Sequence, residues 1–463
     1  MNQDTICAIS TPPGTGGVAI IRLSGPQAIP IAHAVFLPRK KGKELLNQEA
    51  YTVNYGSIYG GNEPVDDVLA SVFRNPHSFT GEDTVEIACH GSLYIQQQIL
   101  RLLIDKGART ALPGEFTQRA FLNGKMDLSR AEAVADLIAS TSAGMHKVAL
   151  NQMRGGFSRK LSHLRDRLLR FASLIELELD FNEEDVEFAS RTDLKQSASD
   201  IEKQIKQLAD SFNTGNAVKN GVPVAIIGQT NAGKSTLLNL LAGEEKAIVS
   251  PIHGTTRDVI EDTVNLSGIT FRFIDTAGLR ETTDTIESLG IERTFGKLKQ
   301  ASIVLWVIDL SAPAAQTEQL APLIIPCLEG KQTILVFNKS DLANAETIDT
   351  PPQLLIHLNA ERICISAKNR KNTDRLKDRL VKAAAIPPIR QNDIIITNIR
   401  HYEALTKAQA AILRVLTGLD QNISADFLSQ DIRECMHYLG EITGHISNDE
   451  ILGNIFKHFC IGK

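Results

Sequence analysis

The stretch Gly228-Gln229-Thr230-Asn231-Ala232-Gly233-Lys234-Ser235 decides the fold of the middle of the chain. It follows the apolar run Val224–Ile227 and precedes the helix-like Thr236–Leu241, which is the strand, loop and helix context of a P-loop. Backbone N–H groups of such a loop wrap phosphates, its lysine neutralises the terminal ones, and its hydroxyl ligates magnesium. We therefore predict a catalytic Lys234, a magnesium ligand in Ser235, and nucleotide contacts from Asn231, Ala232, Gly233, Lys234, Ser235 and Thr236.

Apolar runs alternate with helical segments from Val222 to about Ala383, which predicts a doubly wound parallel sheet. Polar motifs follow its strands, at the edge where an open parallel sheet binds its ligand. The motif Asp275-Thr276-Ala277-Gly278 predicts a carboxylate in the magnesium shell and an N–H near the γ-phosphate. The motif Asn338-Lys339-Ser340-Asp341 predicts recognition of guanine, because the aspartate accepts from two donors that adenine lacks, and Ser366-Ala367-Lys368 closes the base pocket.

A polar loop between these motifs occupies the position of a first switch. We expect Thr256 to complete the magnesium shell when GTP is bound, although an ordinary Gly/Pro turn is the alternative. The residue after Gly278 is Leu279, so the water-positioning glutamine of Ras-type enzymes is absent, and no arginine finger can be assigned. The nucleotide contacts expected from this loop are Ser250, Pro251, Ile252, His253, Gly254, Thr255 and Thr256.

Composition narrows the class of protein. The chain has 463 residues, enough for several domains, and its composition is 43% hydrophobic and 22% charged. It has no apolar run long enough to span a bilayer and no secretory leader over Met1–Ser10, so we expect a cytoplasmic protein without a membrane partner. Six cysteines without a Cys-x-x-Cys pair argue against a zinc ribbon and a disulfide framework.

Nucleic-acid binding would need a local patch, because the formal net charge is −5. One basic cluster lies on a segment whose apolar residues recur three or four apart, as on an amphipathic helix. This cluster could contact RNA, but a solvated helix face is the more common arrangement. Its members are Arg154, Arg159, Lys160, Arg165, Arg167 and Arg170.

The pattern of apolar and polar residues changes along the chain. From Thr5 to about Phe121, short β-like runs accompany one helix, Leu93–Lys106, which indicates an α+β module. Helical patterns run from about Met126 to Val218 and resume after Pro387, and neither stretch has a second layer of its own, so each should pack on the other. We predict a multidomain α+β protein with an N-terminal α+β domain (1–122), a discontinuous helical domain (123–218 and 385–463) and an inserted α/β P-loop domain (219–384).

These motifs together resemble the MnmE (TrmE) family of tRNA wobble-uridine modification GTPases, in the TrmE-Era-EngA-like superfamily. The resemblance spans essentially the whole chain, and its motifs outside the GTPase region are far more specific than the P-loop. The matching residues are Asn231, Gly254–Asp258, Asp275–Glu281, Thr11–Gly14, Gly16–Gly25, Ser78–Asp83, Pro113–Phe116, Lys125–Leu128 and Phe459-Cys460-Ile461-Gly462-Lys463.

The resemblance implies roles for residues that chemistry alone leaves open. It implies a catalytic Glu287 that orients water, assisted by Arg280, and a potassium ion that stands roughly where an arginine finger would. The family often has Thr where this chain has Ser250, which a backbone carbonyl ligand would tolerate. Cys460 could be a reactive thiol or a plain one. The implied potassium ligands are Asn231, Ser250, Ile252 and Thr255, and the implied folate ligands are Arg22, Glu82, Lys125 and Lys463.

The implied activity is a tRNA modification driven by GTP, with Mg²⁺ and K⁺ as ions. A homodimer and an FAD-dependent partner, MnmG, would attach a (carboxymethyl)aminomethyl group to C5 of the wobble uridine, using a 5-formyl- or methylene-tetrahydrofolate; FAD comes only through the partner. The main alternative is a ribosome-assembly or signalling GTPase that acts only as a binding switch. A metabolic folate enzyme with a regulatory GTPase is a third possibility. The N-terminal motifs and the C-terminal tail favour modification, and no Gly-x-x-Gly loop indicates a KH module.

Overall fold

The structure is a computed structural model of the chain, which divides into two compact units. One unit comprises Met1–Ala135, Gln152–Arg170 and Met436–Lys463, and the other comprises Asp136–Asn151 and Phe171–Cys435. The structure describes residues 4–180, 190–244, 262–274, 296, 298–343, 355, 358, 360–387, 389–390, 393–421, 423–446, 449–457, 459 and 462.

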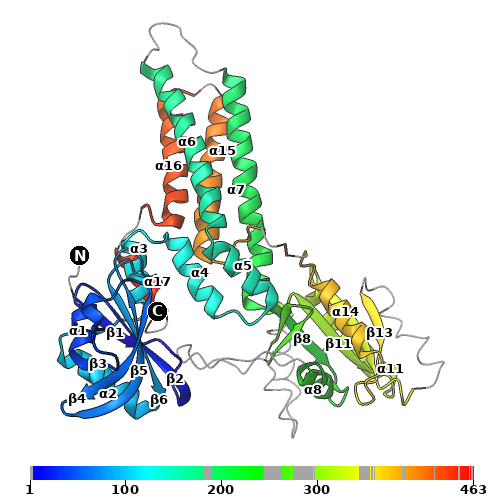
Figure 1. The fold of residues 1–463 in the computed structure, drawn as a ribbon. Helices are drawn as coiled ribbons and strands as arrows, with labels where there is room; N and C mark the ends of the chain where they lie inside the picture. Colours follow the sequence, from blue (N-terminus) through cyan, green and yellow to red (C-terminus); the bar gives the residue numbers. More distant parts are fainter. Residues whose placement is uncertain are drawn as a thin grey trace. The chain divides into compact units, whose positions relative to one another are not determined.

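A seven-stranded sheet forms the N-terminal part of the first unit, in the order β3-β4-β5-β6-β2-β1-β7 (Figure 1). Neighbouring strands are antiparallel except β1 and β7, which are parallel. Its core packs alternate strand residues against helices α1 and α2, which confirms the predicted α+β module. The elements are β1 (Ile6–Ile9), β2 (Gly16–Ser24), α1 (Ala28–Val35), β3 (Phe36–Pro38), η1 (Leu45–Asn47), β4 (Thr52–Gly60), β5 (Glu63–Phe73), β6 (Thr84–Gly91), α2 (Leu93–Asp105) and β7 (Arg109–Thr110).

Three shorter helices follow in the same unit: α3 (Glu115–Leu122), the first part of α4 (Leu128–Ile138) and α17 (Asp449–Lys457). A small apolar core joins α4 to α17 through Leu128 and Phe456. The last helix of the chain therefore packs beside segments that are more than three hundred positions away in sequence.

Long helices make up much of the rest: α5 (Ala143–Met153), α6 (Gly156–Asp180), α7 (Arg191–Asn220), α15 (Ile399–Asp420) and α16 (Ala425–Thr443). Helices α7 and α15 lie side by side, with Phe212 and Tyr402 stacked at a ring-centroid distance of 4.6 Å (Figure 1). The Arg433 guanidinium on α16 contacts the Glu176 carboxylate on α6. The prediction that the two helical stretches pack on each other is confirmed.

The α/β part of the second unit has a six-stranded sheet in the order β13-β12-β11-β8-β10-β9. Five strands are parallel, as predicted, and a sixth strand that the sequence did not predict, β9, runs antiparallel to β10 at the edge. Each face of the sheet has its own apolar core, which is the doubly wound arrangement. The elements are β8 (Val222–Gly228), α8 (Lys234–Glu244), β9 (Asp262–Leu266), β10 (Ile269–Phe273), β11 (Ile303–Asp309), α11 (Ala314–Ile324), η2 (Ile325–Leu328), β12 (Gln332–Asn338), β13 (Glu361–Cys364) and α14 (Thr373–Ala383).

The described residues include no helix that is both long and apolar enough to cross a membrane. Nor do they form a disulfide: Cys7, Cys89, Cys327, Cys364 and Cys435 are free thiols.

Candidate functional site

The P-loop connects the end of β8 to the start of α8, as the sequence predicts. The Lys234 ammonium turns back into the loop and donates to the carbonyl oxygens of Gly228 and Gln229 at 2.7 and 2.5 Å. The positive charge is thus held within the loop, at the amino end of a helix whose own dipole also favours an anion. A phosphate entering the loop would find a lysine already positioned to exchange these carbonyl acceptors for phosphate oxygens.

Asn338 connects this loop to the base-recognition motifs. Its side chain is 2% exposed, donates from Nδ2 to the Ala232 carbonyl at 2.9 Å, and accepts at Oδ1 from the Ala367 N–H at 3.0 Å. Gly233 has a φ of +93°, and a Cβ there would overlap Asn338 Nδ2, so no other residue fits without displacing this contact. The sequence placed Asn338 in the guanine motif but did not reveal that it ties three loops together.

The residues predicted to read guanine lie on two neighbouring loops. A hydrogen bond from the Ser366 side chain lowers the pKa of Asp341, which keeps the carboxylate ionised and able to accept from two base donors. The Ser340 N–H donates to the Ile365 carbonyl at 3.0 Å, which holds the two base loops together. Lys339 has a φ of +61° and pairs its ammonium with Asp309 at 2.6 Å. The predicted base pocket is therefore assembled from both loops.

Two predicted ion ligands lie in the described part of the P-loop. Ser235 is in the first turn of α8, and Asn231 is exposed with a φ of +64°. Among the described residues, the Asn231 side chain has no hydrogen-bond partner, so its amide oxygen is available to a cation. Hydroxyl and amide oxygens are donors that hard cations accept, so this pair fits the predicted ions.

The remaining predicted nucleotide and ion contacts lie outside the described residues. They are Ser250, Pro251, Ile252, His253, Gly254, Thr255, Thr256, Asp275, Thr276, Ala277, Gly278, Arg280 and Glu287. The described part of the chain holds no cluster of three or more His, Cys, Asp or Glu that could bind a metal.

A second set of candidate residues surrounds Arg22 on β2. Its guanidinium donates to Glu86 Oε1 at 2.8 and 2.9 Å. It also lies 5.6 Å from the ring centroids of both Phe79 and Phe116, in cation–π geometry. Sequence reasoning quoted the two aromatic residues within motifs but gave them no role. Phe79 is 37% exposed, so a flat heterocycle could stack on its ring beside the fixed positive charge, whereas Phe116 is fully buried and contacts Arg22 from the core.

Glu82 and Lys125 adjoin the same segment. The Glu82 carboxylate accepts from Ser24 Oγ at 2.7 Å and from an Arg119 N–H at 3.2 Å. The Lys125 ammonium donates to the Pro76 carbonyl at 2.8 Å, and its stem packs against Gly81. The structure thus brings three of the four predicted folate ligands to one part of the first unit, with opposite charges. Lys463 and Cys460 lie outside the described residues.

The C-terminal tail reaches this part of the first unit. The carbonyl of Gly462 accepts from Ser10 Oγ at 3.1 Å, and a Cβ on Gly462 would overlap the Ile9 carbonyl. Ile9 ends strand β1, which pairs with β2 one position away from Arg22. Gly462 therefore lies beside the strand pair that carries Arg22.

The Glu82 carboxylate belongs to a larger ionic network through its contact with Arg119. Arg119 contacts Glu115 at 3.0 Å and Asp4 at 2.8 Å, and Arg109 contacts the same two carboxylates at 2.7 Å. Burial opposes ionisation of Glu115, but hydrogen bonds from Arg109, the Leu112 N–H and Arg119 lower its pKa on balance. Sequence reasoning missed this network; the i,i+4 pair Glu115 and Arg119 on one helix was the signal that could have indicated it.

Two family models and several named relatives match this chain. The family model for the MnmE helical domain matches residues 128–460, and the one for the GTP-binding protein TrmE N-terminus matches residues 5–125. A protein from Bacteroides fragilis (strain YCH46) named tRNA modification GTPase MnmE is 63% identical, with 100% of both chains covered. The chain belongs to the MnmE family. This confirms the family resemblance and the multidomain fold class.

Other MnmE relatives match over the same length. The proteins of that name from Bacteroides thetaiotaomicron and Flavobacterium johnsoniae are 62% and 51% identical, each covering 100% of both chains. Among solved structures, a variant of Aquifex aeolicus Era bound to GDP·AlF4⁻ is 29% identical, covering 41% of this chain and 66% of that one, with a TM-score of 0.26. Family membership rests on the full-length MnmE relatives.

Proposed function

We propose that this chain is a GTP-hydrolysing tRNA modification enzyme. With the flavoprotein partner MnmG, it adds a (carboxymethyl)aminomethyl group to C5 of the wobble uridine of certain tRNAs. The observation that carries this proposal is the 63% identity, over the full length of both chains, to a protein named tRNA modification GTPase MnmE. The P-loop lysine and the guanine-reading Asp341 support the hydrolase part directly.

The GTPase part acts mainly by positioning and charge neutralisation. Lys234 compensates the charge of the terminal phosphates, Ser235 would hold Mg²⁺, and Asp341 selects guanine. Asn231 would hold K⁺, which when bound supplies positive charge beside the phosphates. Glu287 orients the attacking water, assisted by Arg280, because Leu279 has no group that could do so.

The N-terminal domain, over residues 1–122, would bind a tetrahydrofolate derivative that supplies the one-carbon unit. Arg22 and Lys125 suit the carboxylates of a folate, and Glu82 suits the donor groups of its pterin ring. Phe79 adds an exposed aromatic ring next to Arg22. The inserted GTPase domain (219–384) and the two helical segments (123–218 and 385–463) complete this division, with Lys463 as the fourth folate ligand.

An exposed apolar face supports the homodimer. On the outer strands of the N-terminal sheet, Leu37, Val53, Tyr55 and Leu69 are 58%, 61%, 51% and 46% exposed. Tyr55 lies opposite Leu69 in the β4–β5 register, and alternation along the strands puts all four on one face of the sheet. A face of this kind is typical of protein association rather than of a solvated sheet. A second copy of the chain is the partner that we propose for it.

Mass spectrometry of wobble nucleosides tests the proposed function. Transfer RNA from cells that lack this protein should lose the C5-modified uridine, and the wild-type chain should restore it. A Lys234→Ala variant should not restore it, because its nucleotide phosphates are uncompensated. Unchanged wobble nucleosides in the deficient cells would refute the modification role and favour a GTPase that acts only as a binding switch.

A further inference from the structure

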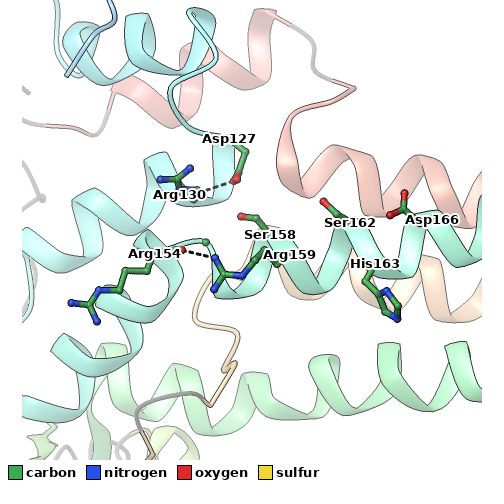
Figure 2. A pocket seen from close by; sticks show the side chains of 9 residues that line it. Asp127, Arg130, Arg154, Ser158, Arg159, Ser162, His163 and Asp166 are labelled. Atoms are coloured by element: carbon green, nitrogen blue, oxygen red, sulfur yellow. Dashed lines mark hydrogen bonds between the residues drawn. The ribbon is translucent and has the colours of Figure 1, made fainter. Parts of the chain in front are cut away.

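A polar pocket of about 440 Å³ lies in the first unit, and none of its lining residues belongs to either candidate site (Figure 2). It forms where the start of α4, the turn after α5 and the start of α6 meet. Three arginines, two aspartates and one histidine contribute to its wall. The lining residues are Asp127, Arg130, Arg154, Gly155, Ser158, Arg159, Ser162, His163 and Asp166. We call it the arginine pocket.

The arginines of the pocket are not neutralised by carboxylates. Arg130 donates from Nε to the Met153 carbonyl at 3.1 Å, and Arg159 donates to the Arg154 carbonyl at 2.9 Å. Within the described part of the chain, Arg130, Arg154 and Arg159 have no carboxylate partner. Other arginines are paired, such as Arg414 with Asp431 at 2.7 Å. The pocket arginines therefore keep most of their N–H donors for a ligand.

A glycine turn brings two of these arginines together. Gly155 is buried with a φ of +79°, and a Cβ there would lie 3.4 Å from Arg159 Nη1 and 3.6 Å from Arg130 Cδ. Any side chain at this position would be strained and would crowd both arginines. The turn thus places like charges on either side of one small residue, an arrangement that an anion between them would stabilise.

The acidic residues of the pocket do not cancel this charge. Asp127 Oδ1 accepts from the Arg130 backbone N–H at 3.0 Å and from Ser129 Oγ at 2.7 Å, which is the capping geometry of a helix start (Figure 2). Asp166 is exposed and lies further along α6. Three arginines against two aspartates leave a positive balance. The amino end of α6, which begins at Gly156, adds its partial positive charge.

We propose that the arginine pocket binds a phosphate of the tRNA backbone. Guanidinium forks match phosphate oxygens in shape and charge, and arginine is the usual residue for such contacts. Helix α6 adds the basic residues Lys160, Arg167 and Arg170, and the span from Arg159 to Arg170 is roughly 17 Å at the rise of an α-helix. Arg165 is not counted in this track, because it packs toward Gly440. A track of that length suits a polyanion better than a single free phosphate. This inference rests on the proposed function and assigns a surface of the chain to contact with its RNA substrate.

Binding of a tRNA transcript to the full-length chain, measured at several salt concentrations, tests the proposal. The pocket variant carries Arg130→Gln, Arg154→Gln and Arg159→Gln. The control carries Arg39→Gln, Arg101→Gln and Lys106→Gln, which removes the same charge from positions elsewhere in the first unit. The pocket variant should bind about tenfold more weakly, and its slope of log affinity against log salt should flatten by about one per lost phosphate contact. The control should stay within about twofold of wild type, because net charge alone contributes little at this range.

Three results would overturn the inference. Equal tRNA affinity of the pocket variant and the control, with wild type binding well, would refute the pocket while leaving the proposed function intact. The pocket would also be refuted if its variant kept its affinity for tRNA but lost binding of inorganic phosphate or of the flavoprotein partner. Absence of tRNA binding by the wild-type chain would refute both. GTP hydrolysis at the wild-type rate and an unchanged melting temperature would show that the variant is folded.

Discussion

We propose that a single residue, Asp341, sets the choice of base. Guanine presents its N1–H and an exocyclic amine to the two carboxylate oxygens. In Asp341→Asn, the side-chain NH₂ would face a donor group of guanine and could not bond to it. We therefore expect kcat/KM for GTP to fall on the order of 100-fold or more. Xanthine carries a carbonyl in place of the amine, so the variant should gain activity with XTP. Steady-state hydrolysis of both nucleotides measures this, and a variant that still prefers GTP would contradict the assignment.

Asn231 can also be tested alone, because its unpartnered amide oxygen lies on the exposed side of the P-loop among the residues that the structure describes. We expect GTP hydrolysis to be faster in potassium than in sodium at equal ionic strength. Asn231→Ala should lose most of this difference, since it removes one ligand without removing a phosphate contact. Equal rates in both salts for the wild-type chain, or an alanine variant that keeps its potassium response, would show that the ion is bound elsewhere or not at all.

Glu287 should support the chemical step and not nucleotide binding. In Glu287→Ala, we expect single-turnover hydrolysis to fall by about 10²-fold or more, the size of a general acid–base or positioning contribution, while GTP affinity persists. Nucleotide affinity from fluorescence titration provides the control. An unchanged single-turnover rate would show that Glu287 does not orient the attacking water.

Among the elements, helix α3 is fixed to the sheet by charge. Arg119 is 7% exposed in its side chain and holds carboxylates from α3, the chain start and the loop at Glu82. Removing it in Arg119→Ala would leave Glu82 without an ionic partner among the described residues, while Arg109 would still pair with Glu115 and Asp4. We therefore expect the first unit to lose about 1.5–3 kcal/mol of unfolding free energy, the size of a lost hydrogen bond to a charged group. Denaturant titration measures the loss, and Arg101→Ala on exposed α2 serves as the control. A loss below about 1 kcal/mol would mean that the network stabilises little.

The same network predicts a pH dependence. The pKa of Glu115 is lowered from its ordinary value of 4.5, so its contribution to stability is complete at neutral pH. It should be lost as the pH falls below about 4.5, through the lowered folded-state pKa. Melting temperature should therefore decline more steeply with acid in the wild-type chain than in Glu115→Gln, which has no such group to titrate. Parallel declines in the two proteins would contradict this account.

Local signals explain what could be predicted from the sequence. The P-loop and the guanine motif carry their chemistry within a few consecutive residues, so their strand, loop and helix context was readable. Strand β9 was missed because Asp262–Leu266 is a short, partly polar run. Its turn to β10, Ser267-Gly268, has φ values of +51° and +82°, which is a two-residue hairpin, and this dipeptide was the available signal.

Tertiary assembly explains what could not be predicted. Phe116 and Arg119 reach Arg22 and Glu82 from a helix that is distant in sequence. Arg130 joins the arginine pocket from α4, so the basic cluster recognised between Arg154 and Arg170 did not include it. Such contacts depend on how elements pack, and periodicity in one segment does not contain that information.

Across the chain as a whole, the GTPase part follows helix α7 directly in the chain. That helix ends at Asn220 and β8 begins at Val222, and a Cβ on Gly215 would overlap the Ile396 carbonyl of the returning chain. We therefore expect movement of the GTPase domain to load α7 and the segment before α15. This coupling counts as allosteric only if two states bind differently at both ends.

The tail offers a test of communication with the N-terminal site. Removing Phe459 to Lys463 deletes no nucleotide motif but removes Gly462, which is bonded to Ser10 beside the Arg22 strand pair. We expect the truncated chain to hydrolyse GTP and to lose wobble-uridine modification. Lys463→Ala in the full-length chain is the control, because it removes only the charge of Lys463 and keeps the rest of the tail. Normal modification by the truncated chain would show that the tail is dispensable.

The proposed function requires that nucleotide hydrolysis at this guanine site drives modification of tRNA. The most direct measurement is formation of the modified wobble nucleoside in a purified system containing the flavoprotein partner, tRNA, a tetrahydrofolate derivative, and glycine or ammonium. We predict that the wild-type chain forms the nucleoside with GTP and not with XTP, and that Asp341→Asn forms it with XTP and not with GTP. If the variant formed the modified nucleoside equally well with GTP and with XTP, this requirement would be contradicted.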